Sequence, residues 1–249
     1  MEYGIPLSWT QEELGGITII AGGKITQEAK DAVSERLDIG NISLICSALQ
    51  QDYPFGLFWY DKTIGVTVNK TYKLSASKSS ISITSGQATY SFAVSADYGN
   101  NYEVNASEVS RAQTAAENAR AIVVAWTEFS DDEKLAGYRD EICSLASYDS
   151  AAASGGVPYG DPWQAIYVFD GDPETKVVCE GYSKAFEYLC DMSEFASSAV
   201  SCISVTGTMN GGKHMWNIVT LYDGKNYLAD VTNSDGGSTS RESGLFLVG

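Results

Sequence analysis

The sequence predicts an α+β protein, with an N-terminal α/β region over residues 1–105 and a second domain over 106–249. Apolar residues recur at helical spacing in three stretches, around 26–52, 107–145 and 180–192. Elsewhere, apolar and polar residues alternate in short runs bounded by turn residues, which is typical of half-buried strands. With 249 residues, 44% of them hydrophobic, the chain can form one large core or two smaller ones.

The N-terminal region should begin with a helix from Thr26 to Asp52, broken at Gly40. Alternating residues then predict four short strands, with a hairpin turn at Ser85-Gly86 between the last two. These strands are 64–68, 72–76, 80–84 and 89–96.

The second domain should begin with two helices. Ser107 is expected to cap a helix that ends near Phe129. Ser130 and Glu133 have the spacing of a capping box, so another helix should start directly after Ser130.

The rest of this domain is predicted as a loop, two helices and three strands. The loop is rich in Ala, Gly and Pro, and the second of the two helices follows directly after Cys179. In chain order these are the loop 151–163, helices 164–168 and 180–192, and strands 199–209, 214–222 and 225–232.

Charge and hydropathy exclude some classes of partner. The net charge of −16 repels phosphate backbones and argues against nucleic acid. No apolar run is long enough for a transmembrane span, and the N-terminus has no signal-peptide pattern. The sequence leaves open the oligomeric state and whether the native chain continues past Gly249.

The five cysteines do not form a metal-binding pattern. There is no Cys-x-x-Cys pair and only one histidine, so neither a zinc site nor any other metal or cofactor is expected. An odd count leaves at least one thiol unpaired within the chain. A Cys190–Cys202 disulfide stays open beside the alternative of buried free thiols.

Cys179, His214 and Asp230 stand in the order of a thiol nucleophile system. Such a system uses a sulfur to attack, an imidazole to deprotonate it and a carboxylate to orient the imidazole. His214 is the only histidine of the chain. At the start of a helix, backbone N–H groups would favour a thiolate on Cys179.

The hairpin that carries His214 and Asp230 gives a geometric test. The two side chains share a face of the sheet only if the loop has three residues, Tyr222-Asp223-Gly224, so that Leu221 pairs with Lys225. Such a loop needs a left-handed residue at its last position, which Gly224 supplies. We therefore predict a three-residue loop with a bulge at Gly224.

Three motifs resemble those of bacterial transglutaminase-like proteins. They are Val178-Cys179-Glu180-Gly181-Tyr182-Ser183, Gly212-Lys213-His214-Met215-Trp216-Asn217 and Leu228-Ala229-Asp230-Val231-Thr232. The resemblance covers roughly residues 135–232. It implies a papain-like transglutaminase core, a helix packed on an antiparallel sheet, in which Cys179 is the nucleophile, His214 the general base and acid, and Asp230 the residue that orients it. A Trp commonly follows the last motif in such proteins, whereas this chain has Asn233.

The family includes cross-linkers, cysteine peptidases and amidases. The resemblance therefore implies acyl transfer from a protein or peptide amide through a thioester, to an amine or to water. Trp216, Tyr182 and Gln164 are the candidate substrate-binding residues. The family and the composition also imply an extracellular or cell-surface location. The alternative is a non-catalytic binding or scaffold module of a bacterial surface protein.

Overall fold

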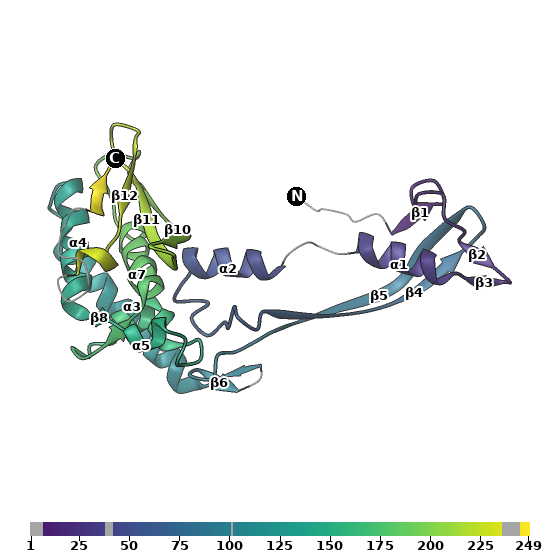
Figure 1. Ribbon diagram of the computed structural model, residues 1–249, viewed down its shortest axis with the longest axis horizontal. Helices are drawn as coiled ribbons and strands as arrows, with labels where there is room; N and C mark the ends of the chain where they lie inside the picture. The colour runs from purple at the N-terminus through teal and green to yellow at the C-terminus, as the bar shows by residue number, and fades with distance from the viewer. Residues whose placement is uncertain (1–6, 38–41, 101, 236–244) are drawn as a thin grey trace. The chain divides into compact units, whose positions relative to one another are not determined.

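A computed structural model describes residues 7–37, 42–100, 102–235 and 245–249 and confirms an α+β protein (Figure 1). The chain divides into two compact units. The N-terminal unit comprises residues 1–44 and 66–92, and the C-terminal unit comprises 45–65 and 93–249.

This division differs from the single boundary predicted near residue 105. Residues 45–65 and 93–105 belong to the C-terminal unit. The reason is packing, because Phe58, Val94 and Tyr98 are buried in the hydrophobic core of that unit.

The helices and strands have the following bounds. The helices are α1 (Gln27–Arg36), α2 (Ile42–Asp52), α3 (Ala106–Ala125), α4 (Asp131–Leu145), α5 (Ser150–Ala153), α6 (Ala165–Val168) and α7 (Cys179–Asp191), with 3-10 turns η1 (Asp161–Trp163) and η2 (Thr232–Ser234). The strands are β1 (Ser8–Thr10), β2 (Ile20–Ala21), β3 (Lys24–Ile25), β4 (Val66–Ala76), β5 (Ser80–Phe92), β6 (Gly99–Asn100), β7 (Glu103–Val104), β8 (Ser147–Tyr148), β9 (Lys176–Val177), β10 (Ser201–Met209), β11 (Gly212–Thr220), β12 (Asn226–Ala229) and β13 (Phe246–Val248).

The N-terminal unit is built on a long antiparallel pair, β4 and β5, with β1 on the other side of β5. Two strands therefore replace the four predicted ones, and the turn predicted at Ser85-Gly86 is wrong. Both residues lie within β5, opposite Lys73 and Tyr72, and the chain reverses at 77–79 instead. Gly86 allows β4 and β5 to approach each other closely, since a Cβ there would lie 3.1 Å from the Cβ of Tyr72.

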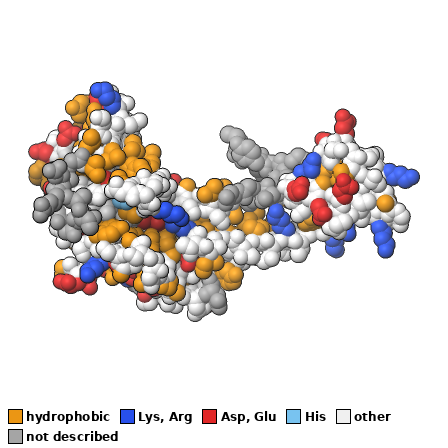
Figure 2. Space-filling model, in the orientation of Figure 1, with side chains coloured by type: hydrophobic (Ala, Val, Ile, Leu, Met, Phe, Trp, Pro, Cys, Tyr) orange, Lys and Arg blue, Asp and Glu red, His pale blue; other side chains and the backbone are white. Residues whose placement is uncertain are grey.

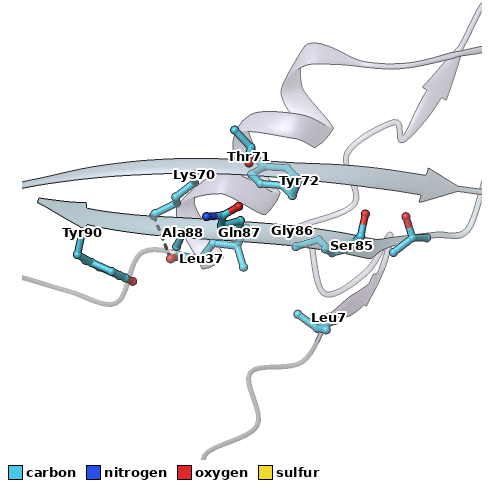
Figure 3. A pocket seen from close by; sticks show the side chains of 12 residues that line it. Leu7, Leu37, Lys70, Thr71, Tyr72, Ser85, Gly86, Gln87, Ala88 and Tyr90 are labelled. Carbon is cyan, nitrogen blue, oxygen red and sulfur yellow. Dashed lines mark hydrogen bonds between the residues drawn. The ribbon is translucent and has the colours of Figure 1, made fainter.

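A pocket of about 280 Å³ opens on this strand pair (Figure 3). Side chains of Tyr72 and Tyr90 line it together with Leu7 and Leu37. The Lys70 ammonium donates to the Leu37 carbonyl at 3.0 Å, which ties β4 to the end of α1. None of the residues predicted for catalysis or substrate binding lines this pocket.

Capping explains where two of the helices begin. The Thr26 hydroxyl accepts from Ala29 N–H at the start of α1, and the predicted break at Gly40 lies outside the described residues. Ser130 and Glu133 form the predicted capping box at the start of α4. The cap predicted at Ser107 is wrong, because α3 begins at Ala106 and Ser107 lies inside its first turn.

The C-terminal unit packs α7 against a four-stranded antiparallel sheet. The strand order is β10-β11-β12-β13, and α7 contacts β10 and β11 (Figure 1). Helices α3, α4 and α6 also contact α7. A helix on an antiparallel sheet is as predicted, whereas the papain-like topology stays a prediction. Within the predicted loop 151–163, the structure has α5 in part and η1.

The hairpin between β11 and β12 confirms the predicted loop. Thr220 pairs with Asn226, the Leu221 N–H donates to the Lys225 carbonyl, and Gly224 has a φ of +72°. The regular ladder ends at Asn217 and Ala229, so Asp230 follows directly on its last pair.

Replacing Gly224 by Ala should lower the free energy of unfolding by about 1 kcal/mol, because a Cβ disfavours the left-handed conformation. Urea unfolding measures the change. Gly212→Ala is the matched control, since Gly212 begins β11 without a positive φ and its nearest Cβ contact would be 3.7 Å away. An equal loss in both variants would contradict the left-handed requirement at Gly224.

Glu187 makes stability pH-dependent. This residue of α7 is 3% exposed and accepts the Ser204 N–H at 2.8 Å. Burial raises the pKa of Glu187 to about 7, and Asp191 and Asp52 add to the rise. The folded state then binds a proton that the unfolded state releases, so this group's contribution to stability falls as pH rises from about 4.5 through 7.

Glu187→Gln should therefore stabilise the protein by about 2 kcal/mol at pH 8 and change little at pH 4. Urea unfolding at the two pH values measures this. Glu128→Gln, at an exposed position, controls for the general loss of one negative charge. A Glu187→Gln variant that is less stable than the wild type at pH 8 would refute the assignment.

Candidate active site

Cys179 is the first residue of α7, as predicted. Val178 precedes the helix in an extended conformation and donates its N–H to the Pro162 carbonyl at 2.8 Å. The thiol is half-buried and free, and it lines a cleft. The first N–H groups of a helix lack intrahelical acceptors, so they leave a positive end beside this sulfur.

His214 and Asp230 meet side chain to side chain. His214 Nε2 lies 2.8 Å from Asp230 Oδ2. The Asp230 side chain is fully buried, whereas 11% of the His214 side chain is exposed. Figure 2 shows the single histidine, in pale blue, at the surface of the C-terminal unit. The predicted hairpin register thus brings the two side chains together.

Burial and two neighbouring groups determine the pKa of His214. Burial lowers this pKa, but the hydrogen bond to Asp230 and the interaction with Cys179 outweigh burial and raise it to about 9. Since Nε2 faces Asp230, Nδ1 is the nitrogen left for the sulfur. His214 is therefore held in its charged form at neutral pH, with an anionic partner on each side when Cys179 is ionised.

Asn233 donates two hydrogen bonds to the Asp230 carboxylate. Its backbone N–H donates to Oδ1 at 3.0 Å, and its side-chain amide donates to Oδ2 at 2.6 Å. The same amide nitrogen lies 3.5 Å from His214 Nε2. The sequence singled out Asn233 only as a departure from the family's Trp; its position in η2 gives it this role.

The cleft beside Cys179 has a volume of about 860 Å³. Small residues and aromatic rings form much of its walls, and two lysines, one glutamate and His214 supply charge. The lining residues are Lys62, Tyr148, Ala152, Ala153, Gly155, Trp163, Val178, Cys179, Glu180, Thr206, Gly207, Thr208, Lys213, His214 and Met215. A cleft of this size can hold several residues of an extended peptide.

A buried ion network lies directly beneath Cys179. Glu180 accepts from Lys184 at 2.7 Å through Oε1 and from Lys62 at 2.5 Å through Oε2. The Tyr159 hydroxyl lies 2.7 Å from Glu180 Oε1 and 2.9 Å from Gln50 Oε1. Burial raises the pKa of Glu180, but Lys184 and Lys62 outweigh it and hold the carboxyl ionised.

Sequence reasoning missed this network. Glu180 and Lys184 have i,i+4 spacing, which ordinarily marks a solvated helix face. No sequence signal marks this burial, because the structure also buries the residues between them by packing other elements around α7.

None of the three predicted substrate-binding residues lines the cleft, and two of them lie in the core. Tyr182 is fully buried, and its hydroxyl donates to Asp235 Oδ2 at 2.6 Å, so its role as a groove wall is wrong. Gln164 is also fully buried and accepts from Lys184 at 3.1 Å. Trp216 stacks on the His214 ring at 5.8 Å and covers Gly207, and its contact with substrate stays a prediction.

The other cysteines are free thiols, with Cys190 and Cys202 buried beside each other in the core. Among the described residues, no cluster of His, Cys, Asp and Glu could hold a metal ion. No helix in the described parts of the chain is long and apolar enough to cross a membrane.

Comparison with known proteins gives a weak similarity of fold. No protein-family model matches the chain, and no curated protein matches it. A crystal structure of a TGase matches with a TM-score of 0.40 and 16% sequence identity. The match covers 77% of this chain and 50% of that chain, so this chain spans about half the length of that structure. The similarity is too low to place the chain in a family.

Proposed function

We propose that the protein transfers acyl groups from peptide or glutamine amides through a thioester on Cys179. The observation that carries this proposal is the placement of His214 between a buried carboxylate, Asp230, and the Cys179 thiol at the wall of a cleft. A nucleophile and a base that line the same cleft, with a carboxylate bonded to the base, are the parts that thiol-dependent acyl transfer needs.

In the proposed resting state, the thiol proton already lies on His214, and in the first step the Cys179 thiolate attacks the amide carbonyl carbon. The backbone N–H groups of Cys179 and Glu180, at the start of α7, face the resulting oxyanion. His214 then gives its proton to the amide nitrogen as the C–N bond breaks. An amine leaves, and the acyl group stays on sulfur as a thioester.

In the second step, an amine or water attacks the thioester carbonyl, and His214 accepts the proton of the nucleophile. The C–S bond breaks and the thiol is restored. An amine acceptor gives cross-linking, and water gives hydrolysis. The two reactions are therefore two outcomes of the same thioester intermediate.

The test is to incubate the protein with a mixture of glutamine-containing peptides and a fluorescent primary amine, and to analyse products by mass spectrometry. We expect either amine-labelled or hydrolysed peptides, together with an adduct on Cys179 that hydroxylamine releases. Cys179→Ala should give none of them. Products that persist in Cys179→Ala, or a Cys179 that never carries an acyl group, would contradict the proposal.

A non-catalytic binding module is the rival function. It would not require a base at the thiol, and it predicts that Cys179 forms no acyl adduct with any peptide. The location at a cell surface also remains a proposal, and detection of the protein in surface fractions of its source cells would test it.

A further inference from the structure

The buried network next to Cys179 has one more positively charged side chain than negatively charged ones. Two ammonium groups, on Lys62 and Lys184, face a single carboxylate, on Glu180. The other acceptors around Lys184 are neutral: the Tyr159 hydroxyl, the Trp163 carbonyl and the Gln164 amide. Burial lowers the pKa of Lys184 to about 8, and repulsion from Lys62 adds to this lowering.

Only one of the two ammonium groups reaches the cleft. Lys184 is fully buried, whereas the side chain of Lys62 is 24% exposed and lines the cleft together with Cys179. The Lys62 ammonium has three donors, of which Glu180 takes one, and it lies 5.4 Å above the Tyr159 ring. It therefore has donors left for a group in the cleft.

The backbone around Lys62 is held firmly. The neighbouring Asp61 is 6% exposed and accepts from the backbone N–H of Thr63 at 2.8 Å and from its hydroxyl at 2.5 Å. The Asp61 N–H donates to the Ala93 carbonyl at 3.0 Å. Lys62 is thus presented from an ordered turn rather than from a loose loop, which limits the entropy lost when it binds an anion.

We propose that the substrate carries a carboxylate next to the attacked amide and that Lys62 binds this carboxylate. The proposal rests on the proposed acyl transfer and names the class of its substrate: an acidic peptide. A carboxylate placed on Lys62 restores charge balance in a poorly solvated network, where an unpaired cation is costly. The site thereby attracts an acidic partner although the chain as a whole carries a net charge of −16.

The experiment compares two alkylating reagents that differ in one charge. Iodoacetate carries a carboxylate and iodoacetamide does not, and mass spectrometry reports the rate of each at Cys179. In the wild type, we expect the iodoacetate-to-iodoacetamide rate ratio to exceed the ratio for the same cysteine in the urea-unfolded chain. Lys62→Gln should lower the ratio about fivefold, the effect of one unit charge about 4 Å away in a water-like dielectric.

Three variants make the assignment specific. Lys62→Arg should keep the ratio, and Lys225→Gln, directly after the hairpin loop, should leave it unchanged while removing the same charge. An unchanged ratio in Lys62→Gln, with folding verified by circular dichroism, would overturn the proposal. Lys213 lines the same cleft. A rate ratio that falls in Lys213→Gln but not in Lys62→Gln would therefore also overturn the proposal.

This test separates the two proposals. Fast alkylation of Cys179 without charge preference would overturn the acidic substrate and leave acyl transfer standing, whereas an unreactive Cys179 would count against acyl transfer itself. Matched peptides with Glu or Gln beside the attacked glutamine, each with a free or an amidated C-terminus, then identify the carboxylate. A preference for Glu indicates a side chain, a preference for the free terminus indicates a chain end, and no preference overturns the proposal.

Discussion

Replacing His214 by Ala should reduce the rate of acylation by an amide substrate by about 10³-fold. An imidazolium about 4 Å from a thiolate contributes roughly 4 kcal/mol at an effective dielectric of about 20, which corresponds to about three powers of ten. The chain has no second histidine to substitute for it. Quenched-flow measurement of the Cys179 thioester, with the peptide that gives most product, reports this rate.

The kind of acyl donor adds a sharper criterion. His214 must protonate the departing amine of an amide, but a p-nitrophenyl ester leaves without a proton. His214→Ala should therefore lose less activity on the ester than on the amide. Lys225→Ala, in the same hairpin, is the control for folding and should act at the wild-type rate. Equal losses on both donors would contradict the role of His214 as an acid.

Replacing Glu180 by Gln should destabilise the protein by about 3 kcal/mol near pH 7, one of the largest stability effects expected from a single substitution here. The variant leaves two ammonium groups without their carboxylate, and one of them, on Lys184, is fully buried. Urea unfolding, read by tryptophan fluorescence, measures the loss.

A double variant tests the cause. Glu180→Gln combined with Lys184→Met removes the unpaired buried charge as well as its partner, so it should recover at least half of the stability lost in Glu180→Gln. Glu128→Gln, at an exposed position, should change stability by less than about 0.5 kcal/mol. A double variant less stable than Glu180→Gln would show that the loss does not come from the charge on Lys184.

Local sequence signals predicted the parts of the structure that local physics controls. The Ser130–Glu133 capping box, the start of α7 at Cys179 and the three-residue loop at Gly224 each depend on a few neighbouring residues. The loop mattered most, because its register alone decided whether His214 and Asp230 could share a face.

Features that depend on distant contacts could not be predicted in this way. The Glu180 network joins residues 62, 159, 180 and 184, which only the folded chain brings together. Tyr182 was expected to line the substrate groove, but α7 is buried on nearly every side and places this ring in the core. Polar residues in the middle of β5 gave the pattern of two short strands, although the structure has one long strand there.

The measurement that tests the central claim most directly is the pH dependence of Cys179 alkylation by iodoacetamide. The account predicts that Cys179 reacts faster than the other four cysteines, that its reaction persists near pH 6, and that His214→Ala removes this low-pH reactivity. A Cys179 that reacts only above about pH 8.5, as an ordinary thiol does, or a His214→Ala variant with the wild-type profile, would contradict an assembled thiolate–imidazolium pair.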